Sequence, residues 1–573
     1  MLIHQSTLPY CYYDKTTKRI VLKLITDDNI KTVKIIYGDP FLYTKKGSTW
    51  KWEYSETSME IQYSTDCIMW QKELTPPPTR RMKYAFIVTD KYNKNTYFSE
   101  INTMEYSNAS INIPHNHFFF PFVHEVDALH TPKWAEDICW YQIFPERFYN
   151  GNPDISPTGT ADWEKDMPKH NNFFGGDLQG IIDKLPYLNS LGITGIYLTP
   201  IFLAPSNHKY DTADYFAIDP HFGDINTLKT LVKQAHALNM RVMLDAVVNH
   251  IGATHHFWQD VLKNQEKSIY KDYFHIHSFP VLESYPNRDA LNYDTFAFAS
   301  KMPKWNTENP AARKYLIDAA IFWIKECDID AWRLDVSDEV SFDFWQEFKQ
   351  EINKVKPDVY LLGELWHDPS KWLNGKYFDA VMNYPLGTVI RDMFILKSID
   401  IETFAKRLAK GLMRFSDIHT KIQFNLLDSH DTARVLTQAG GDKLAIKNAF
   451  IFMYMIKGAP CIYYGTEIGM LGTGDPDCRR PMIWDPKKQD KELFEFFQKL
   501  IGIRKTYAEI IKNAAIIYES KNDFHTWRLI NEKGELNIVY NNGSTTIKHD
   551  KNTLLASDTM FSPGSLQILI SVD

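Results

Sequence analysis

From about residue 137 to residue 505 the sequence alternates between short, nearly continuous apolar runs and helical patterns. There are eight apolar runs, and each is followed by a helix or a short helical stretch. In chain order the runs are ICWYQIF, TGIYLTPI, RVMLDAVVNH, IDAWRLDV, DVYLLGELW, FDAVMNY, KIQFNLLDS and APCIYYGTEIG. Apolar strands that alternate with helices indicate a parallel sheet covered by helices on both faces. Eight such units predict an α/β fold, a closed (β/α)8 TIM barrel.

The segments on either side of this region have a different pattern. Residues 1–125 contain short alternating strands and turns without a convincing amphipathic helix, which predicts an antiparallel β-sandwich. Residues 506–573 return to strands with turn signals and predict a smaller C-terminal β-sandwich. We therefore expect a catalytic barrel at residues 126–505 between two β-domains. Within it, residues 251–308 are expected to form a long loop subdomain after the third barrel strand, and loops of this length are usually functional.

The composition disfavours several kinds of partner. The chain has 573 residues, of which 44% are hydrophobic and 24% charged, and its net charge is −7. This is typical of a globular protein and gives no electrostatic reason to expect binding to nucleic acid or to an anionic membrane. The N-terminus lacks an apolar signal-peptide core, and no apolar run approaches the roughly 18 residues of a membrane span. We therefore expect a cytoplasmic protein without a membrane partner.

The fourth predicted strand contains two ionisable residues where a buried strand is expected. In IDAWRLDV, Arg333 and Asp335 are two positions apart and therefore point to the same face. Buried charges are costly unless they are paired, so the two side chains are expected to form an ion pair. Two explanations remain open here. The pair is either a structural salt bridge at a strand end, or a catalytic carboxylate that the neighbouring guanidinium keeps ionised.

Further polar residues occur where neighbouring strands end. They are Asn249 and His250 after the third strand, Glu364 at the end of the fifth, and His430 and Asp431 after the seventh. Singly, each is explained by a helix cap or by a structural histidine. Together they favour a functional site, because the C-terminal strand ends of such a barrel meet on one rim, where its chemistry takes place.

The chemistry that suits this rim is retaining glycoside hydrolysis. The sequence has three candidate carboxylates but no serine-nucleophile motif, no glycine-rich phosphate loop and no set of three metal-binding histidines. A retaining glycosidase uses one ionised carboxylate as nucleophile and one protonated carboxyl group as acid. Asp335, next to an arginine, is expected to be the anion, and Glu364 is expected to keep a proton because two anions lie nearby. Asp431 would then stabilise positive charge, and His250 and His430 suit hydrogen bonds to sugar hydroxyls.

Four segments, DAVVNH, WRLDVSDEV, GELW and LLDSHDTAR, resemble in order and spacing the signature regions of the α-amylase family of glycoside hydrolases. HKYDTADYFAIDPHFGD, DPDCRRPM and MPKWN are similar to a subfamily that contains neopullulanases, cyclomaltodextrinases and maltogenic amylases. MPKWN resembles the MPKLN block of this subfamily, with Trp305 in place of the usual leucine. The resemblance implies cleavage of α-1,4-glucosidic bonds in cyclodextrins and maltodextrins through a covalent glycosyl-enzyme. Pullulan and starch are further candidate substrates.

The resemblance also assigns roles to single residues. It implies that Asp335 is the nucleophile, Glu364 the acid/base and Asp431 the stabiliser of the transition state. Tyr210 would stack on the sugar at the cleavage site and Trp366 would line the acceptor side, with core packing as the alternative explanation for both. The other residues implied to bind substrate are His208, His250, Arg333 and His430 for hydroxyl groups, and Asp475 and Arg479 for the next sugar on the non-reducing side.

Two further properties are implied by the resemblance alone. Asn150, Asn152, Gly175 and Asp177 match positions that supply oxygen ligands to calcium in relatives, the glycine through its carbonyl group. Hard oxygen ligands suit a structural Ca²⁺ ion, and an ordinary Asn/Gly turn is the alternative. Relatives also carry an N-terminal β-domain of starch-binding type and often form homodimers, in which this domain covers the active site of the partner chain.

The chain departs from the subfamily pattern at VSDEV, where VANEV is usual. Asp338 replaces an asparagine near the acceptor subsites and adds negative charge there. The balance between hydrolysis and transfer to an acceptor sugar therefore stays open, and a glucan transglycosylase on the same scaffold is the first alternative. A non-catalytic carbohydrate-binding protein on a degenerate barrel is the second, and the presence of all three carboxylates disfavours it.

Overall fold

The computed structural model describes residues 1–113 and 115–570. Eight parallel strands form its centre, in the hydrogen-bonded order β21-β20-β19-β18-β15-β14-β23-β22, and a parallel bridge between Met382 and Phe424 closes the barrel. The strands are β14 (Trp140–Ile143), β15 (Gly195–Leu198), β18 (Arg241–Ala246), β19 (Ala331–Leu334), β20 (Tyr360–Gly363), β21 (Ala380–Val381), β22 (Phe424–Asn425) and β23 (Ala459–Tyr463). Each corresponds to one predicted apolar run, so the TIM-barrel prediction is confirmed.

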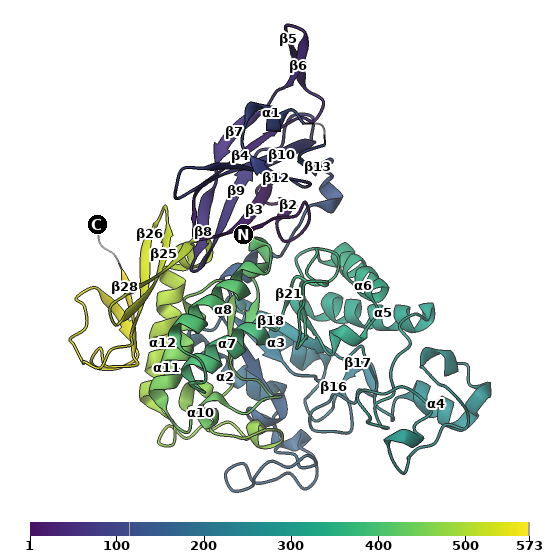
Figure 1. Cartoon of the computed structure of the whole chain (residues 1–573). Helices are drawn as coiled ribbons and strands as arrows, with labels where there is room; N and C mark the ends of the chain where they lie inside the picture. Colours follow the sequence, from purple (N-terminus) through teal and green to yellow (C-terminus); the bar gives the residue numbers. More distant parts are fainter. Residues whose placement is uncertain (114, 571–573) are drawn as a thin grey trace.

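Helices surround the barrel (Figure 1). The main ones are α2 (Leu178–Leu191), α3 (Ile225–Ala237), α5 (Pro310–Cys327), α6 (Phe342–Val355), α7 (Tyr384–Phe394), α8 (Ile401–Met413), α11 (Lys443–Tyr454) and α12 (Lys491–Thr506). Several begin with an acidic or hydroxyl cap, as at Asp224 and Ser341, whose side chains accept a backbone N–H of the first turn. Large side chains such as Trp140, Tyr197 and Met243 fill the inside of the barrel. Because that interior is packed, a substrate can bind only at the rim. Within the described residues, every helix is too short or too polar to cross a bilayer.

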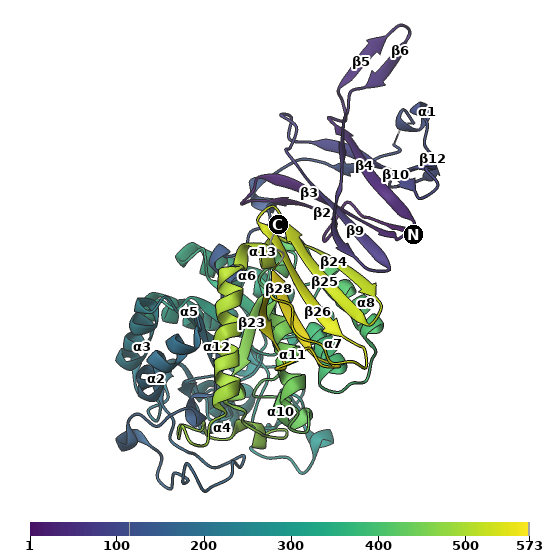
Figure 2. The ribbon, with the colours of Figure 1, turned by 90° about the vertical axis from the view of Figure 1, so that its left-hand side faces the viewer.

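The N-terminal segment forms two facing sheets. One contains β1 (Leu2–Ile3), β2 (Cys11–Asp14), β3 (Arg19–Asp27), β8 (Glu60–Ser64) and β9 (Cys67–Leu74). The other contains β4 (Ile30–Gly38), β7 (Ser55–Ser58), β10 (Met82–Asp90), β11 (Asn95–Phe98), β12 (Thr103–Glu105) and β13 (Phe118–Phe120). A core that includes Leu22, Trp70 and Phe86 lies between the sheets. The hairpin of β5 (Tyr43–Lys46) and β6 (Thr49–Trp52) projects from this domain, away from the barrel (Figures 1 and 2).

The C-terminal strands continue one of these N-terminal sheets. They are β24 (Ala515–Lys521), β25 (Phe524–Asn531), β26 (Gly534–Asn541), β27 (Thr553–Ala556) and β28 (Leu566–Ile570). β24 pairs in parallel with β8, so that β1-β3-β9-β8-β24-β25-β26-β28-β27 is a continuous path (Figure 2). Trp527 packs against Phe404 and Phe452 of α8 and α11, with ring centroids 5.7 and 4.9 Å apart. The two ends of the chain therefore brace each other and the barrel, and the domain limits at residues 125 and 505 stay our proposed division.

A cluster of opposite charges also joins the N-terminal domain to the barrel. Asp417, at the start of the short helix α9 (Asp417–Thr420), forms ion pairs with Lys457 at 2.9 Å and with Lys421 at 3.1 Å. Lys23 of β3 reaches the same place, where its ammonium group donates to the carbonyl of Phe415 at 3.1 Å. Asp417 therefore compensates positive charges that the packing of the two domains brings together.

Residues 251–308 form a lobe beside the barrel that includes α4 (His256–Asn264) (Figure 1). Trp305 anchors this lobe: it is buried, its ring stacks on Phe274 at 5.2 Å, and its indole N–H donates to the hydroxyl of Tyr215 at 3.1 Å. An isolated bridge between His250 and Lys304 ties the end of the lobe to the loop after β18. The lobe therefore forms one wall of any binding site above the C-terminal ends of the barrel strands.

Candidate active site

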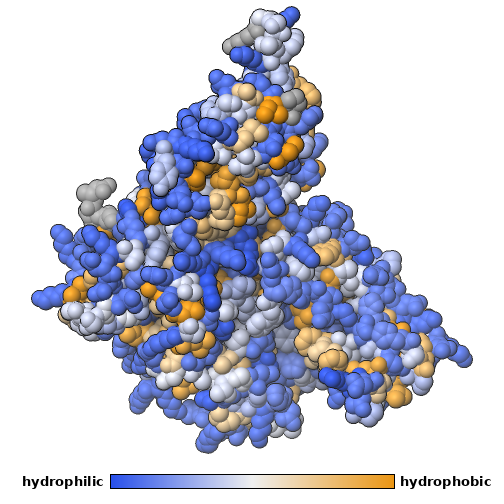
Figure 3. Space-filling view, viewed as in Figure 1, coloured by the Kyte–Doolittle hydropathy of each residue, from blue (hydrophilic) through white to orange (hydrophobic). Residues whose placement is uncertain are grey.

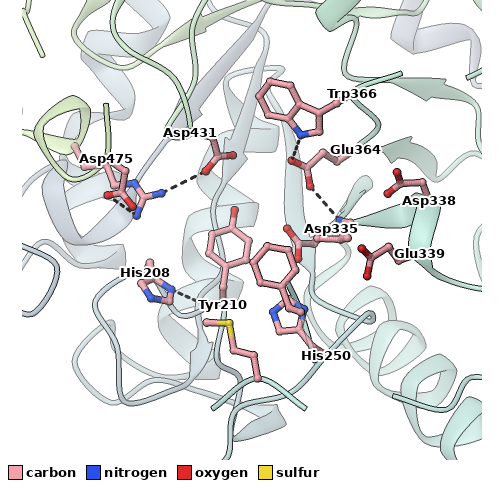
Figure 4. Close-up of a pocket in the computed structure, with 14 residues that line it drawn as sticks. His208, Tyr210, His250, Asp335, Asp338, Glu339, Glu364, Trp366, Asp431 and Asp475 are labelled. Carbon is pink, nitrogen blue, oxygen red and sulfur yellow. Dashed lines mark hydrogen bonds and ion pairs between the residues drawn. The ribbon is translucent and has the colours of Figure 1, made fainter. Parts of the chain in front are cut away.

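A cavity of about 540 Å³ opens at the C-terminal ends of the barrel strands. Nine of the eleven predicted catalytic and substrate-binding residues line it (Figure 4). They are His208, Tyr210, His250, Asp335, Glu364, Trp366, Asp431, Asp475 and Arg479. The other two, Arg333 and His430, are completely buried and lie beneath Tyr210, with which both make contacts. Residues from six separate parts of the sequence therefore meet on one rim, as a TIM-barrel enzyme requires.

The guanidinium group of Arg333 is the centre of the charge network. Its Nη1 atom lies 2.5 Å from Oδ1 of Asp335 and 3.1 Å from both carboxylate oxygens of Asp245. Its Nη2 atom lies 2.7 Å from Oε2 of Glu364. Asp245 and Arg333 are direct neighbours on β18 and β19, so the strand register itself brings them together. The ion pair expected from the sequence is present, but one cation is shared by three carboxyl groups.

This sharing affects the proton affinity of the site. Burial raises the pKa of Asp335 well above its usual range; Arg333 opposes the rise, and the charges of Glu364 and Asp245 add to it. Burial also raises the pKa of Asp245 to about 6, against the effect of Arg333. Arg333 thus lowers the pKa of Asp335, as expected from the sequence, but the same guanidinium also serves two other carboxyl groups. The cluster retains a proton at a higher pH than isolated carboxyl groups would.

Glu364 is held in place by two N–H donors. The backbone N–H of Val336 donates to its Oε2 atom at 3.0 Å, and the indole N–H of Trp366 donates to its Oε1 atom at 3.2 Å (Figure 4). Val336 has φ +42°, which is unusual for a β-branched residue and marks a strained turn directly after Asp335. Trp366 is 54% exposed and stacks on Tyr384 with ring centroids 3.8 Å apart, which leaves its other face open to the cavity.

Tyr210 forms the floor of the cavity, and His430 supports it from beneath. Their rings are parallel, with centroids 5.5 Å apart, and the tyrosine hydroxyl lies 2.7 Å from Nε2 of His430. The amide of Gln142 donates to Nδ1 of the same histidine at 2.7 Å, so Nε2 carries the hydrogen. The tyrosine hydroxyl in turn donates to Asp245 at 3.0 Å. Burial lowers the pKa of His430 well below its usual range, so this histidine is neutral and positions Tyr210.

The other side of the cavity is held by Arg479, on the loop after β23. Its guanidinium contacts Asp475 at 3.0 Å and Asp431 at 3.3 Å, and its Nε atom donates to the carbonyl of His430 at 2.9 Å. Burial raises the pKa of Asp431, and Arg333 and Arg479 oppose the rise. The predicted transition-state stabiliser and the predicted residues for the next sugar therefore form one connected set (Figure 4).

Two neutral histidines complete the walls. Burial lowers the pKa of His208 and of His250 to about 3. Asn249 donates to Nδ1 of His250 at 3.3 Å, which leaves the hydrogen on Nε2, and within the described residues this buried Nε2 atom has no partner. His250 also stacks on Phe296 at 4.9 Å. A buried donor without a partner in a cavity wall suits a ligand hydroxyl.

Some residues of the cavity escaped the sequence reasoning. Phe296 and Met302 reach it from the lobe, and Glu339 follows the fourth strand. Neither Phe296 nor Met302 lies at a strand end, so no periodicity marks them, although MPKWN, which begins at Met302, was noted for its resemblance. Glu339 lies in VSDEV, next to the noted Asp338, and could have been included on that ground.

The four predicted calcium ligands lie close together after β14 and before α2. Three backbone N–H groups donate to the two carboxylate oxygens of Asp177, at 2.6 to 3.3 Å. A carboxylate has about four lone-pair positions, so these hydrogen bonds leave one position for an ion. Asn150 donates to Ser156 at 2.9 Å, but its Oδ1 atom is buried without a partner among the described residues. Gly175 has φ +78° and no room for a Cβ atom beside Asn150. No group of three or more His, Cys, Asp or Glu side chains in the described part of the chain could hold a metal, so an ion here would depend on amide and carbonyl oxygens, which fit Ca²⁺.

A TIM barrel whose rim holds two aspartates and a glutamate around aromatic and hydroxyl-binding groups defines a glycoside hydrolase. The model of the alpha amylase catalytic domain matches residues 142–514, and that of the alpha amylase N-terminal Ig-like domain matches residues 1–124. The chain belongs to the α-amylase family of glycoside hydrolases, in the subfamily predicted from its motifs.

Similar proteins match the chain over almost its whole length. The intracellular maltogenic amylase of Bacillus subtilis (strain 168) is 45% identical over 94% of this chain and 90% of its own length. The cyclomaltodextrinase of Geobacillus thermopakistaniensis (strain MAS1) is 49% identical over 88% and 84%. Neopullulanase 2 of Thermoactinomyces vulgaris is 39% identical over 94% and 92%. A solved structure of a cyclomaltodextrinase covers 100% of this chain and 97% of its own, with a TM-score of 0.86 and 40% identity.

Proposed function

We propose that this enzyme hydrolyses α-1,4-glucosidic bonds in cyclodextrins and short maltodextrins with retention of configuration at the anomeric carbon. The observation that carries the proposal is the contact of Asp335 and Glu364 with the same guanidinium group, at the wall of a cavity that also presents an aromatic floor. Two carboxyl groups this close suit a nucleophile and an acid rather than a pair separated by a water molecule. The names of the relatives, cyclomaltodextrinase and maltogenic amylase, support the choice of substrate.

In the first step an oxygen of Asp335 attacks the anomeric carbon, while Glu364 gives its proton to the glycosidic oxygen. The bond to the leaving sugar breaks, and that sugar departs with a free hydroxyl group. Asp431 stabilises the positive charge that develops on the ring. As this charge develops, it favours the ionised form of Asp335.

In the second step the Glu364 carboxylate takes a proton from water, and the water oxygen attacks the anomeric carbon. The bond to Asp335 breaks and the sugar leaves with its original anomeric configuration. Tyr210 supports the ring of the bound sugar from below, because its hydroxyl and its ring are fixed by His430 and Asp245. His250 offers its N–H, which has no partner among the residues that the structure describes, to a hydroxyl of the same sugar.

The proposal is tested by initial rates on β-cyclodextrin and soluble starch at equal glucosyl concentration. A strong preference for the cyclodextrin is expected, because similar proteins are named cyclomaltodextrinase. Equal or faster cleavage of starch would indicate an open cleft and an ordinary α-amylase, whose N-terminal domain only binds glucan. Pullulan, the remaining candidate substrate, is assayed in the same series.

A second activity, transfer of the glycosyl group to a sugar acceptor, is favoured by the open indole face of Trp366. This face is directly beside Glu364, where an incoming sugar would compete with water for the glycosyl-enzyme. Incubation of maltotriose with excess glucose tests it. Products longer than the substrate support transfer, and their absence at every acceptor concentration contradicts it.

We also propose a homodimer that forms through the N-terminal domain. On and beside the β5–β6 hairpin, Phe41 is 75% and Trp50 is 63% exposed, which is unusual for side chains that gain from burial. Figure 3 shows further apolar residues on the visible face of this domain. One chain has a mass of 66.9 kDa, and sedimentation velocity is expected to give twice this value. The double variant Phe41→Ser, Trp50→Ser is expected to shift the protein towards the monomer.

Two further proposals concern the metal and the compartment. We infer a structural Ca²⁺ ion held by Asn150, Asn152, the carbonyl of Gly175 and Asp177. The supporting observation is the Oδ1 atom of Asn150, which is buried without a partner in the described part of the chain. Calorimetric titration of the chelated protein with Ca²⁺ should show one site, and Asn150→Ala should lose it. A cytoplasmic location is supported by the word "intracellular" in the name of one relative, and cell fractionation tests it.

A further inference from the structure

A buried ion pair next to His208 and Tyr210 takes no part in the proposed reaction. The ammonium group of Lys209 lies 2.6 Å from Oδ2 of Asp219, and their side chains are 1% and 2% exposed. The ammonium group also donates to the carbonyl of Ala204 at 2.9 Å. Removing two charges from water costs about as much free energy as their attraction returns, so such a pair adds little to stability by itself. The neighbours of the lysine in the sequence indicate a different role.

Lys209 separates His208 from Tyr210 in the sequence, and both of these side chains line the catalytic cavity (Figure 4). The lysine side chain takes another direction and is buried, with its ammonium group 5.3 Å from the ring centroid of Phe222. Its backbone has φ +63°, a left-handed conformation that residues other than glycine rarely adopt. Such a conformation persists only where the surrounding contacts hold it. The directions of His208 and Tyr210 therefore depend on the contacts of the lysine between them.

The lysine lies in the middle of a short loop that is closed at its base. Residues 204–213 connect β16 (Phe202–Leu203) to β17 (Asp214–Ile218), and the two strands pair in antiparallel fashion. At the base of the loop the backbone N–H of Ala213 donates to the carbonyl of Leu203 at 2.7 Å. The two ends of the loop are therefore joined, and the position of its middle depends on side-chain contacts.

Asp219 gives the lysine a fixed point at the base of this loop. It directly follows β17, and its Oδ2 atom accepts the backbone N–H of Ala204 at 3.2 Å. Its Oδ1 atom accepts the backbone N–H of His221 at 3.0 Å. The ion pair thus connects the middle of the loop to a carboxylate that the backbone already holds through both oxygens. Lys209 cannot move away without losing its contacts with both Asp219 and Ala204.

The two residues that flank the lysine are also linked to each other. The backbone N–H of Tyr210 donates to Nδ1 of His208 at 3.1 Å (Figure 4), so a change of the backbone at Lys209 would move both. The Tyr210 hydroxyl must also keep its contacts with His430 and Asp245, at 2.7 and 3.0 Å. A displacement of about 1 Å in a group that positions the substrate can lower a rate by roughly 100-fold. Even a small relaxation of the loop would therefore affect catalysis.

We propose that Lys209 and Asp219 are positioning residues for the reaction. Their ion pair holds the loop of residues 204–213 in the conformation that presents His208 and Tyr210 to the sugar at the cleavage site. This inference rests on the proposed function and deepens it: neither residue of the pair touches the substrate, and each acts through the two residues that do.

The kinetics of a double variant test the proposal. Lys209→Met, Asp219→Asn removes both charges together, so that no unpaired ion stays buried and the fold is kept. We expect kcat on β-cyclodextrin to fall by at least about tenfold. KM should change by less than about threefold, because the groups that bind the neighbouring sugars are not altered. Should the double variant fail to fold, Asp219→Asn, which keeps an oxygen for the ammonium group, is measured instead, with an expected fall in kcat of about threefold.

A similarly buried ion pair at the opposite end of the barrel is the matched control. Nζ of Lys349 lies 2.8 Å from Oδ1 of Asp379, which directly precedes β21. Lys349→Met, Asp379→Asn should shift the thermal midpoint about as much as the first double variant does and should leave kcat unchanged. A wild-type kcat in the Lys209→Met, Asp219→Asn variant, or an equal fall of kcat in both double variants, would overturn the proposal.

Hydrogen exchange distinguishes a failure of this inference from a failure of the proposed function. Exchange of the full-length protein, followed by mass spectrometry, requires no turnover. In the Lys209→Met, Asp219→Asn variant the amides of residues 204–213 should exchange at least about tenfold faster than in the wild type, while those of α2 and α3 keep their rates. This result supports the ion pair as the tether of the loop even if the wild type cleaves none of the glucans. Unchanged exchange of the loop would overturn the inference, whatever the activity.

Discussion

Replacing Asp335 by asparagine separates the chemistry of the site from its stability. Asparagine keeps the shape of the side chain but cannot form the glycosyl-enzyme, and no other carboxyl group of the cavity is placed to replace it. We expect kcat on β-cyclodextrin to fall by roughly 10⁴-fold or more, as for other enzymes that lose their nucleophile. Release of reducing ends measures the rate, and Asp343→Asn, an exposed site on α6, should keep the wild-type rate.

The stability of the same variant follows from the charges around Arg333. At neutral pH the guanidinium faces more carboxylates than it can neutralise, and burial raises the pKa of Asp335, so its ionised form destabilises the folded state as the pH rises above about 4. Asparagine removes this cost, while Arg333 keeps Asp245 and Glu364 as partners. The thermal midpoint at pH 7 should therefore equal or exceed that of the wild type. Near-wild-type turnover, or a clear fall in the midpoint, would refute the reasoning.

Three further predictions concern the charge cluster between the domains, the pH profile and the acceptor side. Asp417→Asn should cost about 3 kcal/mol of stability, because it leaves the buried ammonium groups of Lys23 and Lys457 without their counter-ion; urea unfolding measures it. Burial alone would raise the pKa of Asp417, but the neighbouring lysines lower it well below its usual range. The stability that Asp417 contributes to the folded state is therefore present above about pH 4 and is lost as the pH falls further. The acid limb of kcat/KM should lie above about pH 4, because Asp335 must ionise and its pKa is raised; a limb near pH 3 would contradict this. Trp366→Ala should lower the ratio of transfer products to hydrolysis products, since water needs no stacking surface; an unchanged ratio in product chromatography would count against the acceptor role.

The barrel was predictable because its signal is local and repeated. Each strand is a short apolar run, and each catalytic candidate directly follows one of them, so the position of Asp335, Glu364 and Asp431 on one rim follows from topology. The subfamily motifs then located Tyr210 and Trp366, which no periodicity would have distinguished from core residues.

The remaining features depend on contacts between distant segments. The pairing of β8 with β24 joins residues 63 and 516, and neither strand carries a local sign of the other. The charge network is a second example: the sequence shows the arginine two positions from Asp335, but it does not show that Asp245 and Glu364 share the same guanidinium.

The stereochemistry of the product tests the central claim most directly. β-Cyclodextrin is mixed with enzyme at high concentration, and the anomeric proton signals of the first linear product are followed by NMR before mutarotation. The double displacement through Asp335 and Glu364 predicts that the α-anomer appears first and that the β-anomer grows in at the rate of spontaneous mutarotation. Initial release of the β-anomer would mean a single displacement by water and would contradict the assignment of Asp335 as the nucleophile.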